Sequence, residues 1–67
     1  MNGIEVQRKK AGLTQIQLAE AIGVTQANVS IWENGKSLPT ADKLKKISEI
    51  LKCSIEDLFK KENEKRQ

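Results

Sequence analysis

The chain has 67 residues and lacks most of the side chains that carry catalysis or bind metals: it has no histidine, no tyrosine and one cysteine. Imidazole and phenol groups are therefore excluded as acids, bases or metal ligands. The single thiol, Cys53, cannot form a disulfide within the chain and has no histidine to activate it. We expect no catalytic residue, no metal, no cofactor and no small-molecule ligand, which makes an enzyme the weakest interpretation.

Long apolar runs are also missing from the sequence. No stretch approaches the ~18 apolar residues needed to cross a bilayer, and residues 1–5 lack the charged-then-apolar order of a secretory signal. A lone cysteine fits a reducing compartment. We therefore expect a cytoplasmic protein with no membrane partner. The net charge of +3 is too small to indicate nucleic acid by itself, so that argument must come from the order of residues.

Five stretches have the spacing and the capping residues of helices, and no stretch alternates as a strand does. Thr14 with Gln17 fits a reciprocal capping box, whereas Thr25 has no Glu or Gln three residues later. Glycines or Asn-Gly follow three of these helices. The expected helices begin near Asn2, Thr14 and Thr25, ending at Gly12, Gly23 and Asn34-Gly35, and then span 40–51 and 54–60. The domain is predicted over 1–60, and the polar tail 61–67 is expected to fray.

A very short turn joins the second and third expected helices. Helices that close together must cross steeply, and their contact point needs a small residue, which Ala19 supplies. Gly23 stands where the chain must leave the helix with a positive φ. The other apolar positions of this unit, expected to face one core, are Leu18, Ile22, Val24, Val29 and Trp32.

The order of these residues resembles one known family. The segments that carry the resemblance are Gly12-Leu13-Thr14-Gln15, Leu18-Ala19, Ile22-Gly23-Val24-Thr25, Val29-Ser30 and Trp32-Glu33-Asn34-Gly35-Lys36. They are similar to the Cro and phage-repressor helix-turn-helix proteins, often called XRE-type, over about residues 4–59. The resemblance implies an all-α, five-helix, lambda-repressor-like DNA-binding domain, with the helix-turn-helix formed by helices 2 and 3.

In that family the first residues of the third helix face the bases, which here implies Thr25, Gln26, Ala27 and Asn28, with Ile31 one turn later. The amides of Gln26 and Asn28 can each pair with N6 and N7 of adenine, worth about 1–3 kcal/mol of discrimination. Ala27 and Ile31 can lie against thymine methyl groups. We therefore expect adenine and thymine at the contacted positions. Without the resemblance, the two amides would be interpreted as exposed solubilising groups.

Contacts to the DNA backbone are expected on either side of that helix. Thr14 and Gln15 stand at the positive end of the second helix, and Asn34, Lys36 and Ser37 follow the third helix. Such contacts position a protein without reading sequence. The resemblance also implies a partly buried ion pair, Arg8–Glu33, which would tie the first helix to the third and be structural.

The function implied is that of a transcriptional regulator, a repressor, binding a palindromic operator in double-stranded DNA as a homodimer with half-sites about 34–36 Å apart. The alternative is an antitoxin-like or adaptor protein whose main target is another protein. Ile55, Leu58 and Phe59 are expected to be mostly core, although part of this cluster could form a dimer seam. Cys53 is expected to pack as a small apolar residue.

Two residues depart from the family's pattern. Gln7 falls where many relatives have an apolar residue, which would loosen the first helix. Lys52 stands where a glycine often ends the fourth helix, so either a strained lysine or a different end of that helix is expected there.

Overall fold

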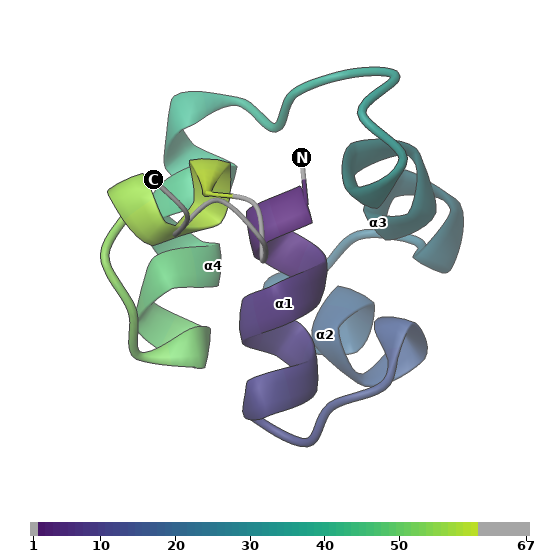
Figure 1. Ribbon diagram of the computed structural model, residues 1–67. Helices are drawn as coiled ribbons and strands as arrows, with labels where there is room; N and C mark the ends of the chain where they lie inside the picture. The colour runs from purple at the N-terminus through teal and green to yellow at the C-terminus, as the bar shows by residue number, and fades with distance from the viewer. Residues whose placement is uncertain (1, 61–67) are drawn as a thin grey trace.

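The computed structural model describes residues 2–60, with side chains from Gly3 onward. Its elements are α1 (Asn2–Lys10), α2 (Gln15–Ile22), α3 (Gln26–Glu33), α4 (Ala41–Leu51) and the 3₁₀ segment η1 (Glu56–Phe59). Over residues 2–60 there is no strand, which confirms the all-α prediction. In Figure 1, α1 lies in the middle, with α2 and α3 on one side and α4 and η1 on the other. The tail expected to fray, 61–67, lies outside the described residues.

The fifth expected α-helix, 54–60, is a correction: residues Glu56–Phe59 form a single 3₁₀ turn instead. Ser54 N–H donates to Asp57 Oδ2 at 3.2 Å, and Asp57 N–H donates back to Ser54 Oγ at 3.1 Å. Backbone bonds then join residues three apart, as from Leu58 N to Ile55 O at 3.0 Å, and Lys60 is extended. The segment is too short to close i→i+4 bonds, so it keeps the tighter geometry.

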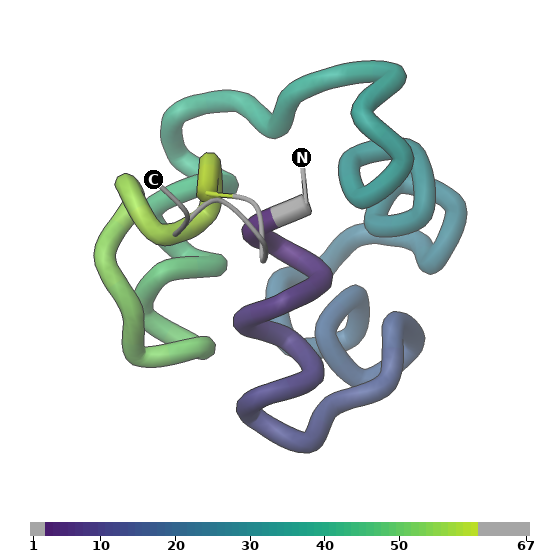
Figure 2. Tube along the Cα trace, in the orientation of Figure 1, coloured from purple at the N-terminus to yellow at the C-terminus, as the bar shows by residue number. Residues whose placement is uncertain are grey.

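The predicted ends of α2 and α3 are confirmed. Thr14 makes the capping box with Gln17, and Gly23 ends α2 in the left-handed region with φ 80°. The short connection between α2 and α3 can be followed in the trace of Figure 2. Thr25 caps α3 through the N–H of Asn28. At α4 the N-cap residue is Thr40, but its hydroxyl donates to Asp42 Oδ1 and caps no backbone N–H.

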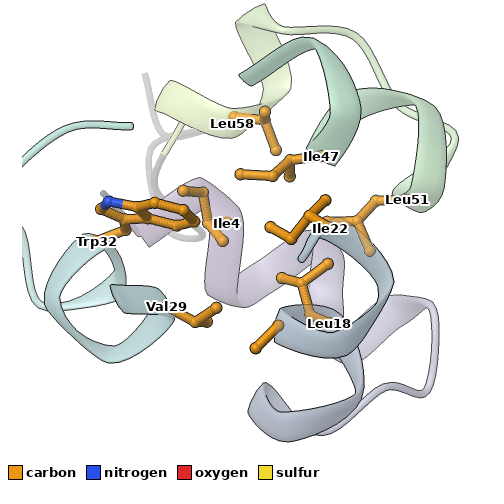
Figure 3. Packing of buried hydrophobic residues seen from close by; sticks show 9 residues of the cluster. Ile4, Leu18, Ile22, Val29, Trp32, Ile47, Leu51 and Leu58 are labelled. Atoms are coloured by element: carbon orange, nitrogen blue, oxygen red, sulfur yellow. The ribbon is translucent and has the colours of Figure 1, made fainter. Parts of the chain in front are cut away.

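One apolar core joins all five elements, as the side chains in Figure 3 show. Ile4 of α1, Leu18 of α2, Val29 of α3, Ile47 of α4 and Leu58 of η1 are fully buried. Burying such side chains contributes about 1.5–3 kcal/mol each. The other buried apolar residues of the cluster are Ala19, Ile22, Trp32 and Leu51. The expected positions of the helix-turn-helix core are therefore confirmed, except that Val24 is only partly buried.

The last apolar cluster is more exposed than the sequence predicted. Leu58 is buried, but Ile55 is 43% exposed and Phe59 is 49% exposed. A longer amphipathic helix would bury a whole stripe of apolar side chains. A 3₁₀ turn of four residues buries one of them. Two apolar side chains are therefore left on the surface beside the buried Leu58.

Gly3 determines how closely η1 packs on α1, a role that the sequence interpretation missed. A Cβ at this position would lie 2.3 Å from the backbone oxygen of Asp57 and 2.4 Å from the carbonyl of Leu58. Only a residue without a side chain allows the two backbones to approach so closely. Gly3 thus brings Leu58 into the core beside Ile4.

The two departures noted in the sequence have different outcomes. Lys52 ends α4 in the left-handed region with φ 55°, a conformation that costs a side-chain-bearing residue free energy; the predicted strain is confirmed. Gln7, the other departure, is half-buried in an intact α1.

Cys53 is half-buried against the core, and this burial raises the pKa of its thiol, so packing is its role in the fold. Among residues 2–60, none of the helices has the length and hydropathy of a membrane span.

Candidate nucleic-acid interface

The helix α3 has one buried face and one exposed face. Val29, Trp32 and Glu33 turn into the molecule, with 0%, 6% and 5% of their surfaces exposed. The positions expected to read bases lie on the other side: Gln26, Ala27, Asn28 and Ile31 are all exposed. The structure therefore brings these side chains together on one helix surface, which we call the α3 surface.

The turn between α2 and α3 sets the direction of the α3 surface. Gly23 N–H and Val24 N–H both donate to Ala19 O, at 2.9 and 3.0 Å. These bonds close the end of α2 as a left-handed cap and turn the chain. Thr25 follows at once as the N-cap of α3 in an extended conformation. Because the corner takes so few residues, the start of α3 is held rigidly against the end of α2.

Thr25 does not offer its hydroxyl to a partner outside the chain, although the sequence placed it among the base-reading residues. Its Oγ1 accepts the N–H of Asn28 at 3.2 Å and donates its own hydrogen to Asn28 Oδ1 at 3.1 Å. The hydroxyl therefore holds both the first turn of α3 and the side chain of Asn28. The sequence showed the cap but not this second bond, because it depends on the rotamer of Asn28.

Gln15 links the starts of α2 and α3. Its Oε1 accepts a hydrogen bond from Gln26 Nε2 at 3.3 Å, and its Nε2 donates to Glu33 Oε1 at 2.9 Å. The sequence interpretation gave Gln15 only a phosphate-binding role. The contact with Gln26 escaped it because the register across the corner is not encoded in local spacing.

The expected Arg8–Glu33 ion pair is present, and it is more buried than expected. Arg8 Nε donates to Glu33 Oε2 at 2.6 Å and Nη2 donates to Oε1 at 3.2 Å, while Nη1 donates to Leu13 O at 2.8 Å. Arg8 and Glu33 are 8% and 5% exposed. The hydrogen bond to Glu33 raises the pKa of Arg8 above its ordinary value. With Gln15 also donating to Glu33, one carboxylate joins α1, α2 and α3.

The residues expected to contact the DNA backbone differ in how free their polar groups are. Thr14 N–H donates to Gln17 Oε1 at 2.8 Å, and the Thr14 hydroxyl accepts from Gln17 N–H at 3.0 Å. The capping box thus already uses both groups of Thr14. Beyond α3, Asn34 Nδ2 is 3.4 Å from Ser30 Oγ, and Asn34, Lys36 and Ser37 are exposed.

These side chains offer hydrogen-bonding, apolar and positively charged groups. Across the described residues, no group of three or more histidine, cysteine or acidic side chains could hold a metal ion. Two further apolar side chains that the sequence interpretation did not assign stand near the ends of this region, Ile16 in α2 (52% exposed) and Leu38 after α3 (61% exposed).

A helix-turn-helix family model matches residues 4–58 of the chain. The chain belongs to the XRE-type helix-turn-helix family. It is 40% identical over 52 residues to the cryptic phage CTXphi transcriptional repressor RstR of Vibrio cholerae, covering 78% of this chain and 46% of that protein. It is 41% identical over 51 residues to the transcriptional regulator DicA of Escherichia coli, covering 76% and 38%. The chain thus spans less than half the length of these two relatives.

The fold of this XRE-type chain is also that of a solved structure. The P22 c2 repressor, crystallised with a synthetic operator, matches with a TM-score of 0.80 at 32% sequence identity, covering 90% of this chain and 94% of that one. The family prediction made from the helix-turn-helix residues is therefore confirmed.

Proposed function

We propose that this chain binds double-stranded DNA in a sequence-specific way, with α3 in the major groove, and represses transcription as a homodimer. The observation that carries the proposal is the division of α3: its apolar face closes the core, while Gln26, Ala27, Asn28 and Ile31 face solvent together. Two exposed amides beside two apolar groups match what the major groove displays, since base edges there carry polar atoms and thymine methyls. The likeness to an operator-bound repressor supports the same assignment.

The reading residues are proposed to be Gln26 and Asn28 for polar edges and Ala27 and Ile31 for thymine methyls. Thr25 belongs to this surface as a positioning residue, because its hydroxyl accepts the backbone N–H of Asn28 and donates to the side-chain oxygen of Asn28. Gln26 is positioned in turn by Gln15. Residues held in place before binding lose less conformational freedom when they bind, so these contacts support affinity as well as selectivity.

Phosphate contacts are proposed for the start of α2, at Thr14 and Gln15, and for Asn34, Lys36 and Ser37 after α3. At the start of α2 the capping box uses the N–H groups of Thr14 and Gln17. The backbone N–H groups between them, of Gln15 and Ile16, have no acceptor within the helix and carry the positive end of the helix dipole. At the other flank Lys36 supplies a full positive charge on an exposed segment. Both flanks would fix the orientation of α3 in the groove without reading sequence.

The experiment that tests the proposal is selection of bound duplexes from a random pool at a stated salt concentration, followed by affinity measurements across salt. Enrichment of one palindromic sequence is expected, with a log–log slope of about −0.9 per neutralised phosphate. Lys36→Ala should reduce that slope by about one unit. Lys46→Ala, which removes an exposed lysine on α4, is the matched control and should leave the slope unchanged. Absence of any enriched sequence would refute sequence-specific binding.

The homodimer is proposed to form over the exposed apolar side chains Ile55 and Phe59. Contiguous exposed apolar surface often marks a protein–protein contact, and Ile55 and Phe59 place two such side chains four residues apart. Sedimentation equilibrium of the wild-type chain and of an Ile55→Ser, Phe59→Ser double variant tests this part. A dimer that the double variant weakens is expected. A variant that dimerises as the wild type does would place the interface elsewhere and leave the DNA proposal intact.

Repression is proposed to follow from occupation of an operator that overlaps a promoter. The description of RstR as a transcriptional repressor supports this sign of regulation. A reporter promoter carrying the selected palindrome should lose transcription when the chain is expressed. An increase in transcription would assign the chain as an activator instead.

A further inference from the structure

The hydrogen bonds at the start of α3 leave the two reading amides with different groups to offer. Thr25 Oγ1 accepts the backbone N–H of Asn28 at 3.2 Å, so the hydroxyl hydrogen is available to donate, and Asn28 Oδ1 takes it at 3.1 Å. With the amide reversed, the hydroxyl would receive two N–H donors, and its own hydrogen would have to turn to solvent, where Thr25 is exposed. Asn28 is therefore oriented with its carbonyl toward Thr25 and its Nδ2 group away from it.

Gln26 has the opposite arrangement. One hydrogen of its Nε2 group is donated to Gln15 Oε1 at 3.3 Å. Because an amide nitrogen carries two hydrogens and the amide oxygen carries two lone pairs, Gln26 retains one N–H and its Oε1. That pair is the combination that adenine requires, since adenine shows an acceptor at N7 and a donor at N6.

We propose that Asn28, oriented by Thr25, reads guanine rather than adenine. This inference rests on the proposed function and assigns one base within it. Guanine displays two acceptors in the major groove, N7 and O6, and a single nitrogen with several hydrogens can serve both, as the amine of lysine does. The Nδ2 group of Asn28 is directed away from Thr25 and has two hydrogens to donate.

Adenine fits this orientation less well. Bidentate pairing with adenine needs the amide oxygen and nitrogen side by side in the plane of the base. In Asn28 the oxygen faces Thr25 and gives one of its two lone pairs to the hydroxyl. The side chain is also one methylene shorter than that of Gln26, so it has less reach to bring oxygen and nitrogen side by side onto one base. The resulting half-site carries an adenine opposite Gln26 and a guanine opposite Asn28, which departs from the expectation of adenine for both.

The test compares duplexes selected by the wild-type chain with those selected by Asn28→Ala and by Gln26→Ala. The base pair whose preference disappears in each variant is the one that the residue reads. At the Asn28 pair the wild-type chain is expected to enrich guanine by about tenfold over adenine. Replacing that guanine by 7-deazaguanine, which lacks the N7 acceptor, should weaken binding of the wild-type chain several-fold without any change to the protein.

Thr25 variants then separate orientation from simple helix capping. Thr25→Ala should bring the guanine-to-adenine ratio at the Asn28 pair close to one while the preference at the Gln26 pair persists. Thr25→Ser, which keeps the hydroxyl, should retain the wild-type ratio. If Thr25→Ala weakened every position equally, Thr25 would act only as a cap and the inference would be wrong. Thermal melting confirms that each variant is folded at the assay temperature.

The remaining outcomes distinguish this inference from the proposed function. Enrichment of adenine, thymine or cytosine at the Asn28 pair by a wild-type chain that still selects one palindrome would overturn the guanine assignment alone. Insensitivity of binding to 7-deazaguanine would do the same. A wild-type chain that enriches no sequence would overturn sequence-specific binding itself, and the assignment with it.

Discussion

The helices α2 and α3 begin with the same chemistry and finish it differently. Each has a threonine at the N-cap and an amide side chain three residues later, Thr14 with Gln17 and Thr25 with Asn28. Gln17 reaches back to the backbone N–H of Thr14 and closes a capping box. The side chain of Asn28 is one methylene shorter, and its Oδ1 accepts a hydrogen bond from the Thr25 hydroxyl instead. The oxygen of the first amide thereby bonds the backbone, whereas the oxygen of the second bonds a hydroxyl, and the second amide stands on the α3 surface.

This difference shows how one helix-turn-helix divides structural and reading roles. The α2 start is closed by its own capping box, and Gln15 behind it is held by the buried carboxylate of Glu33. The α3 start takes its support from α2, through Gln26 and Gln15, and keeps its outer face for a ligand. Support therefore runs from the buried ion pair through α2 to α3.

The largest expected effect is at the root of that support. Glu33→Ala should lower the free energy of unfolding by about 3–5 kcal/mol, because it leaves the buried guanidinium of Arg8 without its partner. The same change removes the hydrogen bond from Gln15 to Glu33. Gln15 is then less well placed to accept from Gln26, so the start of α3 should become less ordered. Urea unfolding measures the loss. Glu49→Ala on the exposed side of α4 is the matched control and should change stability by less than about 0.5 kcal/mol.

Replacing both members of the ion pair separates charge from packing. Arg8→Met with Glu33→Leu should recover much of the stability that Glu33→Ala loses, because an apolar pair of similar size leaves no buried charge. A double variant as unstable as the single one would show that the hydrogen bonds to Leu13 and Gln15, rather than the unpaired charge, account for the loss.

The next effect tests whether the two helix starts depend on the distant contact of α1 with η1. Gly3→Ala should cost at least about 1–3 kcal/mol, since its Cβ would meet the backbone of Asp57 and Leu58 rather than a movable side chain. Ala11→Ser, at an exposed position in the turn after α1, serves as the control. Where the Gly3→Ala protein is still folded, its base preferences should equal those of the wild type. Changed preferences would mean that η1 influences the α3 surface.

A smaller effect comes from exchanging the two amides that close the caps. Asn28→Gln should let the side chain reach the backbone N–H of Thr25 and form a capping box, which raises stability by roughly 0.3–1.5 kcal/mol. Gln17→Asn should lower stability by a similar amount, because the box at Thr14 opens. Thermal unfolding of both variants gives the comparison. If both changes destabilised the protein, side-chain length would not explain the difference between the two caps.

Local chemistry made much of this fold predictable. The caps at Thr14 and Thr25 and the left-handed Gly23 were evident because each depends on residues a few positions apart. The ion pair of Arg8 with Glu33 spans 25 positions, and only the resemblance to a family indicated it. Features that depend on how elements meet escaped prediction. Gly3 against Asp57 and Gln26 against Gln15 require a packing distance or a register that no spacing in the sequence encodes.

The smallest expected effect concerns a second reciprocal cap, in which a carboxylate stands where α2 and α3 have amides. Ser54 and Asp57 exchange backbone and side-chain bonds at the start of η1, and the hydrogen bonds from Ser54 hold the pKa of Asp57 below its usual range. A carboxyl with a lowered folded-state pKa contributes stability that is present above its unfolded pKa of about 3.9 and is lost as pH falls through the folded value. The melting temperature should therefore decline slightly below about pH 4.

Asp57→Asn should remove part of that decline. The caps at Thr14 and Thr25 should be unaffected by acid, because their partners are neutral amides. A decline of the same size in the Asp57→Asn protein would assign the acid sensitivity to other carboxyls, of which Asp42, whose pKa is lowered by the Thr40 hydroxyl, is the next to replace.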